Sequence, residues 1–347
     1  MRAPGSLAAA LLLIAAACGG PTPSASVHPS PAAPVGSPSA PPTELVLGQS
    51  ISAYYDPQIE RVVLVNGAEE HGPAKPTELW TWDGNAWELL DASGPEARSF
   101  GGVARDPNRG VVVVQGGISS SGTEFDETLE WDGSAWTVHP AAGEGPGPRE
   151  GPGLAWDPAS QQMLLFGGGS NLELPPETWG WDGTAWTQVV DTGPRPRFVN
   201  LMTEDRSGEG GVLLNGGHWV EGNDGGFLDD TWRWDGNAWA EVAQDAGPGP
   251  RVNAPGAWDE RLGGIVMHGG GEDAAGTMST DTWLWHDGWT LLETPTAPTP
   301  RNAPALAFDS KRQVLVLVGG IDRPAGKQRL DVWELDANGW HEVLAPT

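Results

Sequence analysis

The chain has 347 residues, and its 50 Gly, 32 Pro and 19 Trp contrast with two Tyr, one Cys and five Met. So many Trp residues beside so little other aromatic character indicate one structural position that is filled repeatedly. The formal charge of −27 argues against nucleic acid and anionic membranes as partners, because both require a basic surface on the protein. A single Cys excludes an internal disulfide framework and a zinc site built on Cys ligands.

The first 43 residues predict export rather than a folded domain. Arg2 is followed by an apolar run over 7–17, which is shorter than the ~20 residues of a membrane-spanning helix and fits a secretory signal. The run ends in Ala15-Ala16-Ala17-Cys18-Gly19. This string resembles a bacterial lipobox, except that Ala15 stands where Leu is usual, and the resemblance implies lipidation of Cys18. An ordinary secretory signal that ends at a Cys is the alternative.

We therefore expect a lipoprotein signal peptide over residues 1–18 and a disordered tether, rich in Pro, Ser and Ala, over residues 19–43. A segment of that composition cannot bury enough apolar surface to offset the entropy lost on ordering. The protein would be exported and attached by lipid to the cell envelope, on the outer side of a bacterial membrane or in the periplasm. It would meet the membrane only through this anchor.

The remainder, residues 44–347, contains six copies of one unit. Trp-Asp-Gly-x-Ala-Trp occurs at 82–87, 131–136, 181–186 and 234–239, with a shortened copy at 285–289 and a degenerate one at 335–340. An Arg precedes an Asp by eight residues in five units, a glycine turn follows that Asp, and an acid stands four residues before each Trp-Asp-Gly position. The arginines are Arg98, Arg149, Arg197, Arg251 and Arg301, and the acids are Glu78, Glu127, Glu177, Asp230, Asp281 and Asp331.

Each unit of about 50 residues predicts four short strands. Small residues form the first strand, an apolar run such as 111–114 the second, an alternating run such as 178–181 the third, and the last Trp begins the fourth. Asp-Gly between the third and fourth strands is a strong hairpin signal, because Gly accepts a positive φ. Six such units predict an all-β, six-bladed β-propeller, with one unit per blade. We expect the sixth blade to pack directly on the first.

The glycine pair after an apolar strand and the Trp that begins each fourth strand resemble kelch repeats, over residues 44–347. The resemblance implies a kelch-type propeller similar to the galactose-oxidase-like central domain. It does not extend to that enzyme's copper-radical chemistry, which uses a Tyr crosslinked to a Cys, a second Tyr and two His ligands. The single Cys belongs to the signal and the only tyrosines are the adjacent Tyr54 and Tyr55, so we exclude the oxidase.

Most repeated residues are expected to be scaffold. The Trp positions predict packing between neighbouring blades, rather than stacking on a carbohydrate. For the five arginines two interpretations stay open: each pairs with an acid or with loop carbonyls and closes a seam between blades, or they form a ring at the channel mouth that binds an anionic group. Some kelch domains bind acidic peptides through Arg at comparable places, so the resemblance permits the second interpretation.

Positions that break the repeat are the candidate ligand-binding residues. The apolar position before the glycine turn is polar in four units, where Asn66, Gln115, Asn215 and His268 stand, and we expect these side chains at one end of the channel. The loops that follow carry His71, His218 and Trp219. The longest of them spans 217–230, and irregular loops on a rigid scaffold commonly carry binding sites. The alternative is that the polar side chains only hydrogen-bond the glycine turn.

The residues support no catalytic motif, so enzymatic activity is uncertain and we expect no cofactor. Three histidines could converge on zinc, and the acidic loops could bind calcium. We expect a monomeric, lipid-anchored binding or scaffold module for a protein or glycan, acting through the loops at the channel mouth. The alternatives are an epimerase, mutarotase or lyase acting on an acidic sugar, and a calcium-dependent adhesion module.

Overall fold

The computed structural model describes residues 44–345 except 70–71, 142, 144, 172, 209, 244–246, 272–275 and 323–325. The predicted signal peptide over 1–18 and the predicted tether over 19–43 lie outside the described residues. In the described part, strands, turns and loops make up the whole structure and no α-helix occurs. No described helix is therefore long and apolar enough to cross a membrane.

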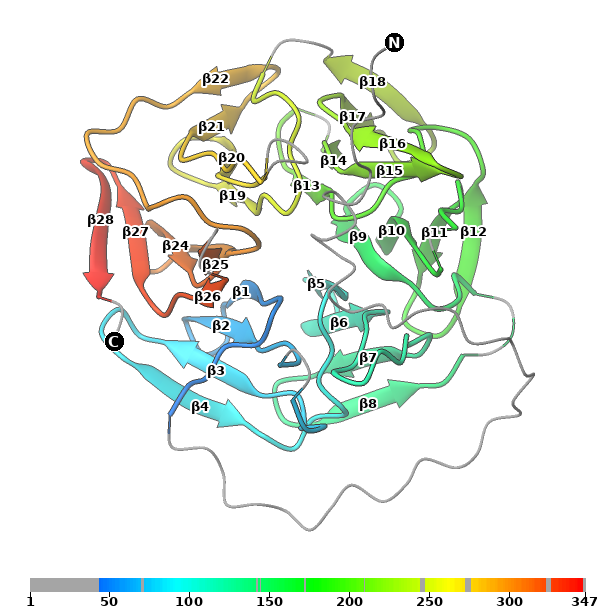
Figure 1. The fold of residues 1–347 in the computed structure, drawn as a ribbon, viewed down its shortest axis with the longest axis horizontal. Helices are drawn as coiled ribbons and strands as arrows, with labels where there is room; N and C mark the ends of the chain where they lie inside the picture. Colours follow the sequence, from blue (N-terminus) through cyan, green and yellow to red (C-terminus); the bar gives the residue numbers. More distant parts are fainter. Residues whose placement is uncertain are drawn as a thin grey trace, which may run out of the picture.

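Six antiparallel sheets of four strands form the blades of a β-propeller, which confirms the predicted fold (Figure 1). Within each blade the strands pair in chain order, and the first strands of neighbouring blades contact each other around the central channel. The blades are, in order, β1 Ser52–Asp56, β2 Arg61–Val65, β3 Leu79–Trp82 and β4 Trp87–Asp91; β5 Gly102–Asp106, β6 Val111–Gln115, β7 Thr128–Trp131 and β8 Trp136–His139; β9 Glu150–Asp157, β10 Gln162–Gly169, β11 Thr178–Trp181 and β12 Trp186–Val190; β13 Leu201–Asp205, β14 Gly211–Asn215, β17 Thr231–Trp234 and β18 Trp239–Ala243; β19 Gly256–Asp259, β20 Gly264–His268, β21 Thr282–Trp285 and β22 Trp289–Leu291; β23 Ala305–Asp309, β24 Val314–Val318, β27 Val332–Asp336 and β28 Gly339–Leu344.

The Asp-Gly turns join the third and fourth strands as the sequence predicts. In blade one, Asp83 Oδ1 accepts hydrogen bonds from the backbone N of Asn85 at 2.8 Å and of Ala86 at 2.9 Å. These bonds hold the pKa of Asp83 below its usual value. Gly84 has a φ of 99°, which a residue with a Cβ adopts only at a cost. The turn chemistry therefore fixes the hairpin that positions both Trp residues of the unit.

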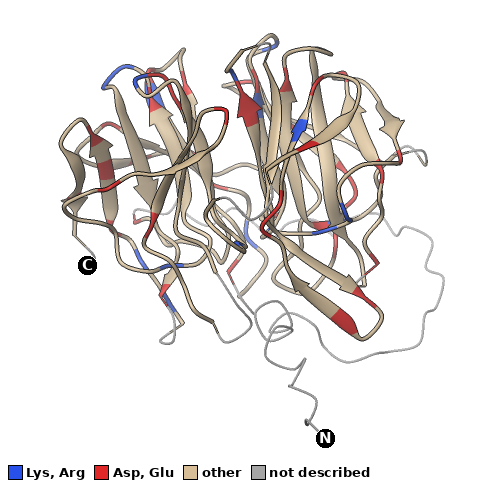
Figure 2. Ribbon diagram, turned by 90° about the horizontal axis from the view of Figure 1, so that it is seen from above, with Lys and Arg blue, Asp and Glu red and all other residues tan. Residues whose placement is uncertain are grey.

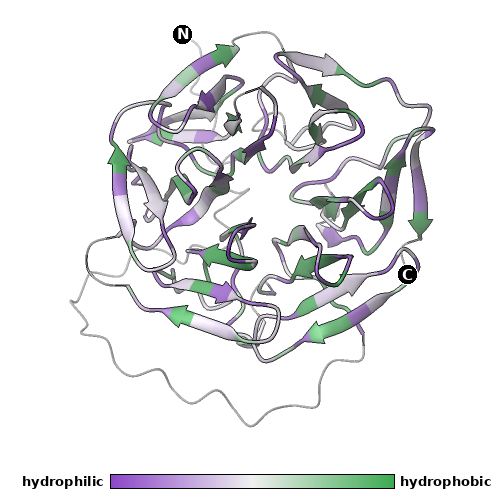
Figure 3. Cartoon of the chain, turned by 180° about the vertical axis from the view of Figure 1, so that it is seen from behind, coloured by the Kyte–Doolittle hydropathy of each residue, from purple (hydrophilic) through white to green (hydrophobic). Residues whose placement is uncertain are grey.

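The core lies in the seams, by which we mean the contacts between neighbouring blades. The second strands are almost completely buried, and the hydrophobic residues concentrate on the strands (Figure 3). In four seams the Trp that begins the fourth strand donates its indole N–H to the Thr that begins the third strand of the preceding blade. The pairs are Trp186–Thr128 at 2.8 Å, Trp239–Thr178 at 2.9 Å, Trp289–Thr231 at 2.9 Å and Trp340–Thr282 at 2.8 Å.

The ring closes by direct packing of blade six on blade one, as the sequence predicts. Blade six has its own fourth strand, β28, and the first strands β23 and β1 are in contact. Leu45 and Leu47, which precede β1, are buried in the same apolar cluster as Val318 and Trp82. The incoming chain therefore fills the closing seam from one side without adding a strand to the sheet of blade six.

Two blades carry an additional hairpin between their second and third strands, where the sequence predicts only loops. In blade four it consists of β15 (His218–Glu221) and β16 (Asp224–Phe227), and in blade six of β25 (Ile321–Asp322) and β26 (Lys327–Gln328). The turn of the blade-four hairpin is Gly222-Asn223, with Gly222 at a φ of 60°. Gly-Asn is a recognised hairpin signal, which the prediction of an irregular loop over 217–230 did not use.

Candidate functional site

The loop face is the end of the propeller where the first strands begin and the second strands end. A cavity of about 200 Å³ opens there at the mouth of the channel. Its rim includes residues at equivalent positions in five blades, all with a positive φ: Phe100, Gly151, Val199, Asn253 and Ala303. A non-glycine residue in this region costs about 1–2 kcal/mol. Its recurrence around the ring means that the repeat itself imposes this backbone conformation.

Backbone hydrogen bonds connect these rim residues to each other. The amide N of Gly151 donates to Phe100 O at 2.7 Å, Val199 N donates to Gly151 O at 2.9 Å, and Asn253 N donates to Val199 O at 2.9 Å. The positive φ values turn each chain so that one blade's amide meets the carbonyl of the blade before it. The mouth is therefore a preformed rim with fixed backbone geometry, on which loops of different length are mounted.

The five arginines expected at this face are buried, and each lies beside the acid of its own blade. Two of them form bidentate pairs: Arg197 with Asp230 at 2.5 and 2.8 Å, and Arg301 with Asp331 at 2.9 and 2.7 Å. The other pairs are Arg98–Glu127 at 2.9 Å, Arg251–Asp281 at 3.7 Å and Arg149–Glu177 at 4.0 Å. The arginines are thus paired as the first interpretation expects, but each pair lies within one blade and does not close a seam, and these side chains do not form a free cationic ring around the channel.

The arginines also hold the glycine turns. Arg149, Arg197 and Arg301 each donate to the carbonyl of the first glycine of that turn, at 2.9–3.0 Å. Arg149 has the most distant acid among these pairs, and burial lowers its pKa to about 10, although the charge of Glu177 opposes that effect. The Arg side chain thus completes the end of the second strand, where backbone carbonyls would otherwise stay unpaired in a buried place.

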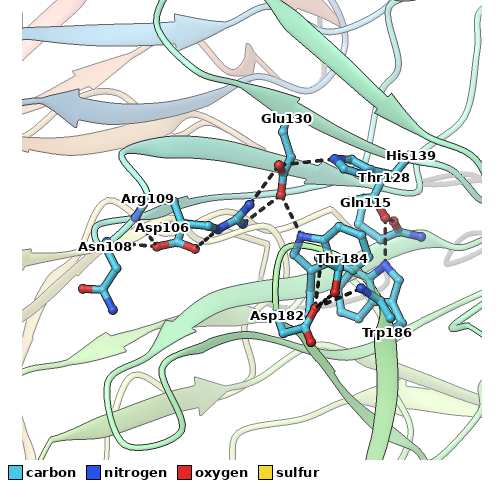
Figure 4. A network of polar contacts seen from close by, with 12 residues as sticks. Asp106, Asn108, Arg109, Gln115, Thr128, Glu130, His139, Asp182, Thr184 and Trp186 are labelled. Carbon is cyan, nitrogen blue, oxygen red and sulfur yellow. Dashed lines mark hydrogen bonds and ion pairs between the residues drawn. The ribbon is translucent and has the colours of Figure 1, made fainter.

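The four polar residues before the glycine turns lie in the seams, and this differs from the expected position at the channel. None of them lines the cavity at the mouth of the channel. Gln115 Oε1 accepts from Thr128 Oγ1 at 2.6 Å, and Thr128 Oγ1 accepts from Trp186 of blade three (Figure 4). The second strand is one strand away from the channel axis, so its last side chain points between blades.

His268 and Asn215 use the same arrangement. His268 Nδ1 is 2.9 Å from Thr282 Oγ1, and Asn215 Nδ2 donates to Thr231 Oγ1 at 3.0 Å. Burial, reinforced by the positive charge of Arg301, lowers the pKa of His268 to about 3. His268 is therefore a neutral seam residue at neutral pH. Asn66 instead bonds the incoming chain, accepting from Gly48 N at 2.9 Å and donating to Val46 O at 2.8 Å.

The hairpin β15–β16 of blade four carries the other candidate residues. His218 is buried between Phe198 and Phe227, with ring centroids 5.2 and 5.0 Å away, and burial lowers its pKa. Trp219 is partly exposed, and the Arg195 guanidinium lies over its ring at 3.2 Å from the centroid. Arg195 also pairs with Glu221 at 3.1 Å. The hairpin thus presents an aromatic ring, a cation and an anion side by side.

An apolar cluster beneath the hairpin was not predicted from the sequence. Phe198, Val199 and Val252 are buried there, and Val220 and Phe227 of the hairpin pack against them. The hairpin also bonds blade four directly, because the backbones of Phe198 and His218 exchange hydrogen bonds at 3.0 Å. It is therefore a fixed projection from the loop face, visible at the lower right of Figure 2 with acidic residues at its tip.

The remaining candidates concern metals. His71, from the loop of blade one, lies outside the described residues. Among the residues that are described, no group of three or more His, Cys, Asp or Glu side chains is placed to hold a metal ion. Asp224, in the acidic tip considered for calcium, accepts a hydrogen bond from Gly225 N at 3.0 Å. Of the two described candidate histidines, His218 packs between two Phe rings, and His268 is buried in a seam next to Thr282.

Comparison with known proteins adds no family assignment. No protein-family model matches the sequence, and no curated protein was found to be similar to it. What is established is the architecture, a six-bladed β-propeller with a hairpin projecting from the loop face of blade four.

Proposed function

We propose that the propeller is a binding module for a protein partner, and that the contact is made by the hairpin β15–β16 on the loop face. The observation that carries this proposal is the side-by-side placement of Trp219, Arg195 and Glu221 on a fixed projection. Trp and Arg are the residue types most enriched among those that dominate binding energy at protein interfaces. A rigid base lowers the entropy lost on binding.

The partner in this proposal presents basic side chains. Glu221 and Asp224 stand exposed at the tip of the hairpin, and the chain as a whole carries a formal charge of −27. A basic partner is attracted at long range by such a field. A glycan is the less favoured ligand, because the Arg195 guanidinium covers one face of the Trp219 ring. An enzyme for acidic sugars would need free guanidinium groups, and the five repeated arginines lie beside carboxylates.

The finer identity of the module also belongs to this proposal. The blades would be of the kelch type, on the strength of the glycine pairs and of the Trp that begins each fourth strand. The chain would be exported, with Cys18 lipidated. Residues 19–43 would then separate the anchor from the propeller by up to about 90 Å when fully extended. Replacing Cys18 by Ser should release the protein from the membrane fraction, whereas Ser24→Ala should leave it there; retention of the Cys18 variant would contradict the anchor.

Site-specific crosslinking tests the binding surface. A photoreactive amino acid at Val220, on the hairpin, should give a discrete covalent adduct in cells that express the full chain. The matched control is the same amino acid at Val138, which is 50% exposed on the outer strand β8. Trp219→Ala should abolish the adduct at position 220. Equal labelling from both positions, or an adduct that survives Trp219→Ala, would contradict the proposed surface. Binding to a glycan array that depends on Trp219 would replace the protein partner by a glycan.

A further inference from the structure

The end of the channel opposite the loop face contains a larger cavity, of about 350 Å³, lined by the ends of all six first strands. Each first strand ends in an Asp, and the residue before that Asp lines the cavity in every blade. We call these six residues the pre-aspartate ring. Four are aromatic and two are charged: Tyr55, Arg105, Trp156, Glu204, Trp258 and Phe308.

Arg105 is a cation without a carboxylate partner. Among the described residues, no Asp or Glu oxygen forms an ion pair with the Arg105 guanidinium. By contrast, each of four other arginines pairs with a carboxylate: Arg61, Arg109, Arg206 and Arg312. This is unusual for a chain with more than twice as many acidic as basic residues. Arg105 is also only partly exposed, so water replaces the missing partner incompletely.

Tyr54, on the first strand of blade one, is one of the residues around the same cavity. Its side chain is 8% exposed and packs in the apolar cluster between blades one and two, with Val63 and Trp131. The hydroxyl is buried without a hydrogen-bond partner among the described residues. Burial, together with the nearby charge of Asp56, raises the pKa of Tyr54, so the hydroxyl stays protonated and remains a donor. The hydroxyl is thus closed off from the cavity, and Arg105 of blade two is the donor on this wall.

The opposite wall of the cavity carries a net negative charge. Arg206 lies between two carboxylates, Glu204 at 2.9 Å and Glu260 at 3.8 Å, so the three groups sum to −1. They belong to blades four and five, which face blade two across the ring. Trp258, on the first strand of blade five, is partly exposed in the same cavity. An ammonium group between these carboxylates and this ring would gain ion-pair and cation–π attraction.

We propose that this cavity binds a small zwitterion, an amino acid with an apolar side chain, with its carboxylate on Arg105 and its ammonium group toward Glu204 and Glu260. A guanidinium fits a carboxylate through two parallel hydrogen bonds. The two poles stand on opposite walls, which suits a ligand that carries both charges. The site lies at the other end of the channel from the hairpin, so it does not rest on the proposed partner-binding function.

Calorimetric titration of the purified full chain at neutral pH tests this site with three probes. L-phenylalanine carries both charges, L-phenylalaninamide lacks the carboxylate, and N-acetyl-L-phenylalanine lacks the ammonium group. We expect saturable binding of L-phenylalanine and binding at least about tenfold weaker for both capped probes. The proposal is overturned if L-phenylalanine shows no saturable binding up to about 10 mM, because a specific small-molecule site should have a dissociation constant below that concentration. If N-acetyl-L-phenylalanine binds as tightly as L-phenylalanine, the ammonium group makes no contribution; the site is then a simple anion site and the zwitterion proposal is overturned.

Two variants locate the poles. Arg105→Gln should weaken L-phenylalanine binding at least about tenfold, and Glu204→Gln should weaken it too while sparing N-acetyl-L-phenylalanine. The matched control is Arg61→Gln, which removes an Arg that pairs with Glu88 away from the cavity and should leave binding unchanged. If Arg105→Gln binds like the control, the proposal fails. If Arg105→Gln does not fold, Glu204→Gln is compared with Arg61→Gln instead, and the proposal fails if these two variants bind L-phenylalanine equally well.

Discussion

The seam between blades four and five and the seam between blades six and one occupy equivalent places but are built differently. In the first, Asn215 and the Trp289 indole both bond Thr231 Oγ1. In the second, Val332 stands at the Thr position, and the indole N–H of Trp87 has no hydrogen-bond partner among the described residues.

The closing seam keeps another repeated contact. Trp82 donates to Glu334 of blade six at 3.1 Å, and Glu334 also pairs with Arg312, just as Trp181 donates to Glu130, which pairs with Arg109, in the seam between blades two and three. Leu45 and Leu47 add apolar surface that the other seams lack. The difference shows that polar side chains at repeated positions are one of several ways to fill a seam. Their recurrence therefore reports architecture, and a binding site is better sought where the chain departs from the repeat.

The largest effect is expected from the incoming segment of the closing seam. Leu47 is 5% exposed, so Leu47→Ala should lower the free energy of unfolding by about 2–5 kcal/mol, through lost burial and a cavity. The neighbouring Val46 is 55% exposed, and Val46→Ala should change the free energy of unfolding by less than about 0.5 kcal/mol. Urea unfolding measures both. Equal effects of the two variants would mean that the incoming segment does not hold the ring closed.

The seam between blades five and six should depend on pH through His268. Its pKa in the folded protein is lowered to about 3, below the ~6.5 of an unfolded chain. The unfolded state therefore binds the proton first, and the stability contributed by the neutral His268 falls by about 2 kcal/mol between pH ~6.5 and ~4.5. His268→Asn, which copies blades one and four, should lack this part of the pH dependence. Parallel stability curves for the two proteins would contradict a buried, neutral His268.

Removing the hydroxyl of the regular seam should have an intermediate effect. Thr231→Val leaves the Trp289 indole without an acceptor in a partly buried place and should cost about 1–3 kcal/mol. Thr290→Val, on an exposed position of β22, is the matched control and should change the free energy of unfolding by less than about 0.5 kcal/mol. A loss no larger than that of the control would mean that the Thr–Trp contact does not stabilise the seam.

The smallest effect is the reverse exchange in the closing seam. Val332→Thr offers the Trp87 indole the acceptor found in four other seams, and should raise the free energy of unfolding by about 0.5–1.5 kcal/mol. Val332→Ala, which offers no acceptor, should lower it. Destabilisation by Thr as large as that by Ala would show that the closing seam excludes a hydroxyl at this position.

The fold was predictable because its signals are local. Each Trp-Asp-Gly string reports one strand–turn–strand unit, and Gly84 shows the positive φ that the turn requires. The seam contacts were not predictable from the sequence, because Trp289 and its acceptor Thr231 are 58 residues apart and belong to different units. The polar character of His268 and Asn215 at an apolar position is plain in the sequence, whereas the Thr to which each is bonded is not.

The candidate sites were predictable only where a residue breaks the repeat. The long loop 217–230 and Trp219 were identified in this way. Arg195 was missed, since its contact with Trp219 depends on the hairpin bringing two loops together. Arg105 and Glu204 do break an otherwise aromatic position, but that pattern becomes visible only when the first strands are aligned by their final Asp.

The adduct formed at position 220 distinguishes repeated scaffold from binding surface most directly. It should be compared between Trp219→Ala, which alters the hairpin, and Thr231→Val, which weakens a seam under conditions where the protein stays folded. We predict that Trp219→Ala abolishes the adduct at an unchanged free energy of unfolding, whereas Thr231→Val keeps the adduct despite lower stability. Retention by Trp219→Ala together with loss by Thr231→Val would contradict the assignment of binding to the hairpin.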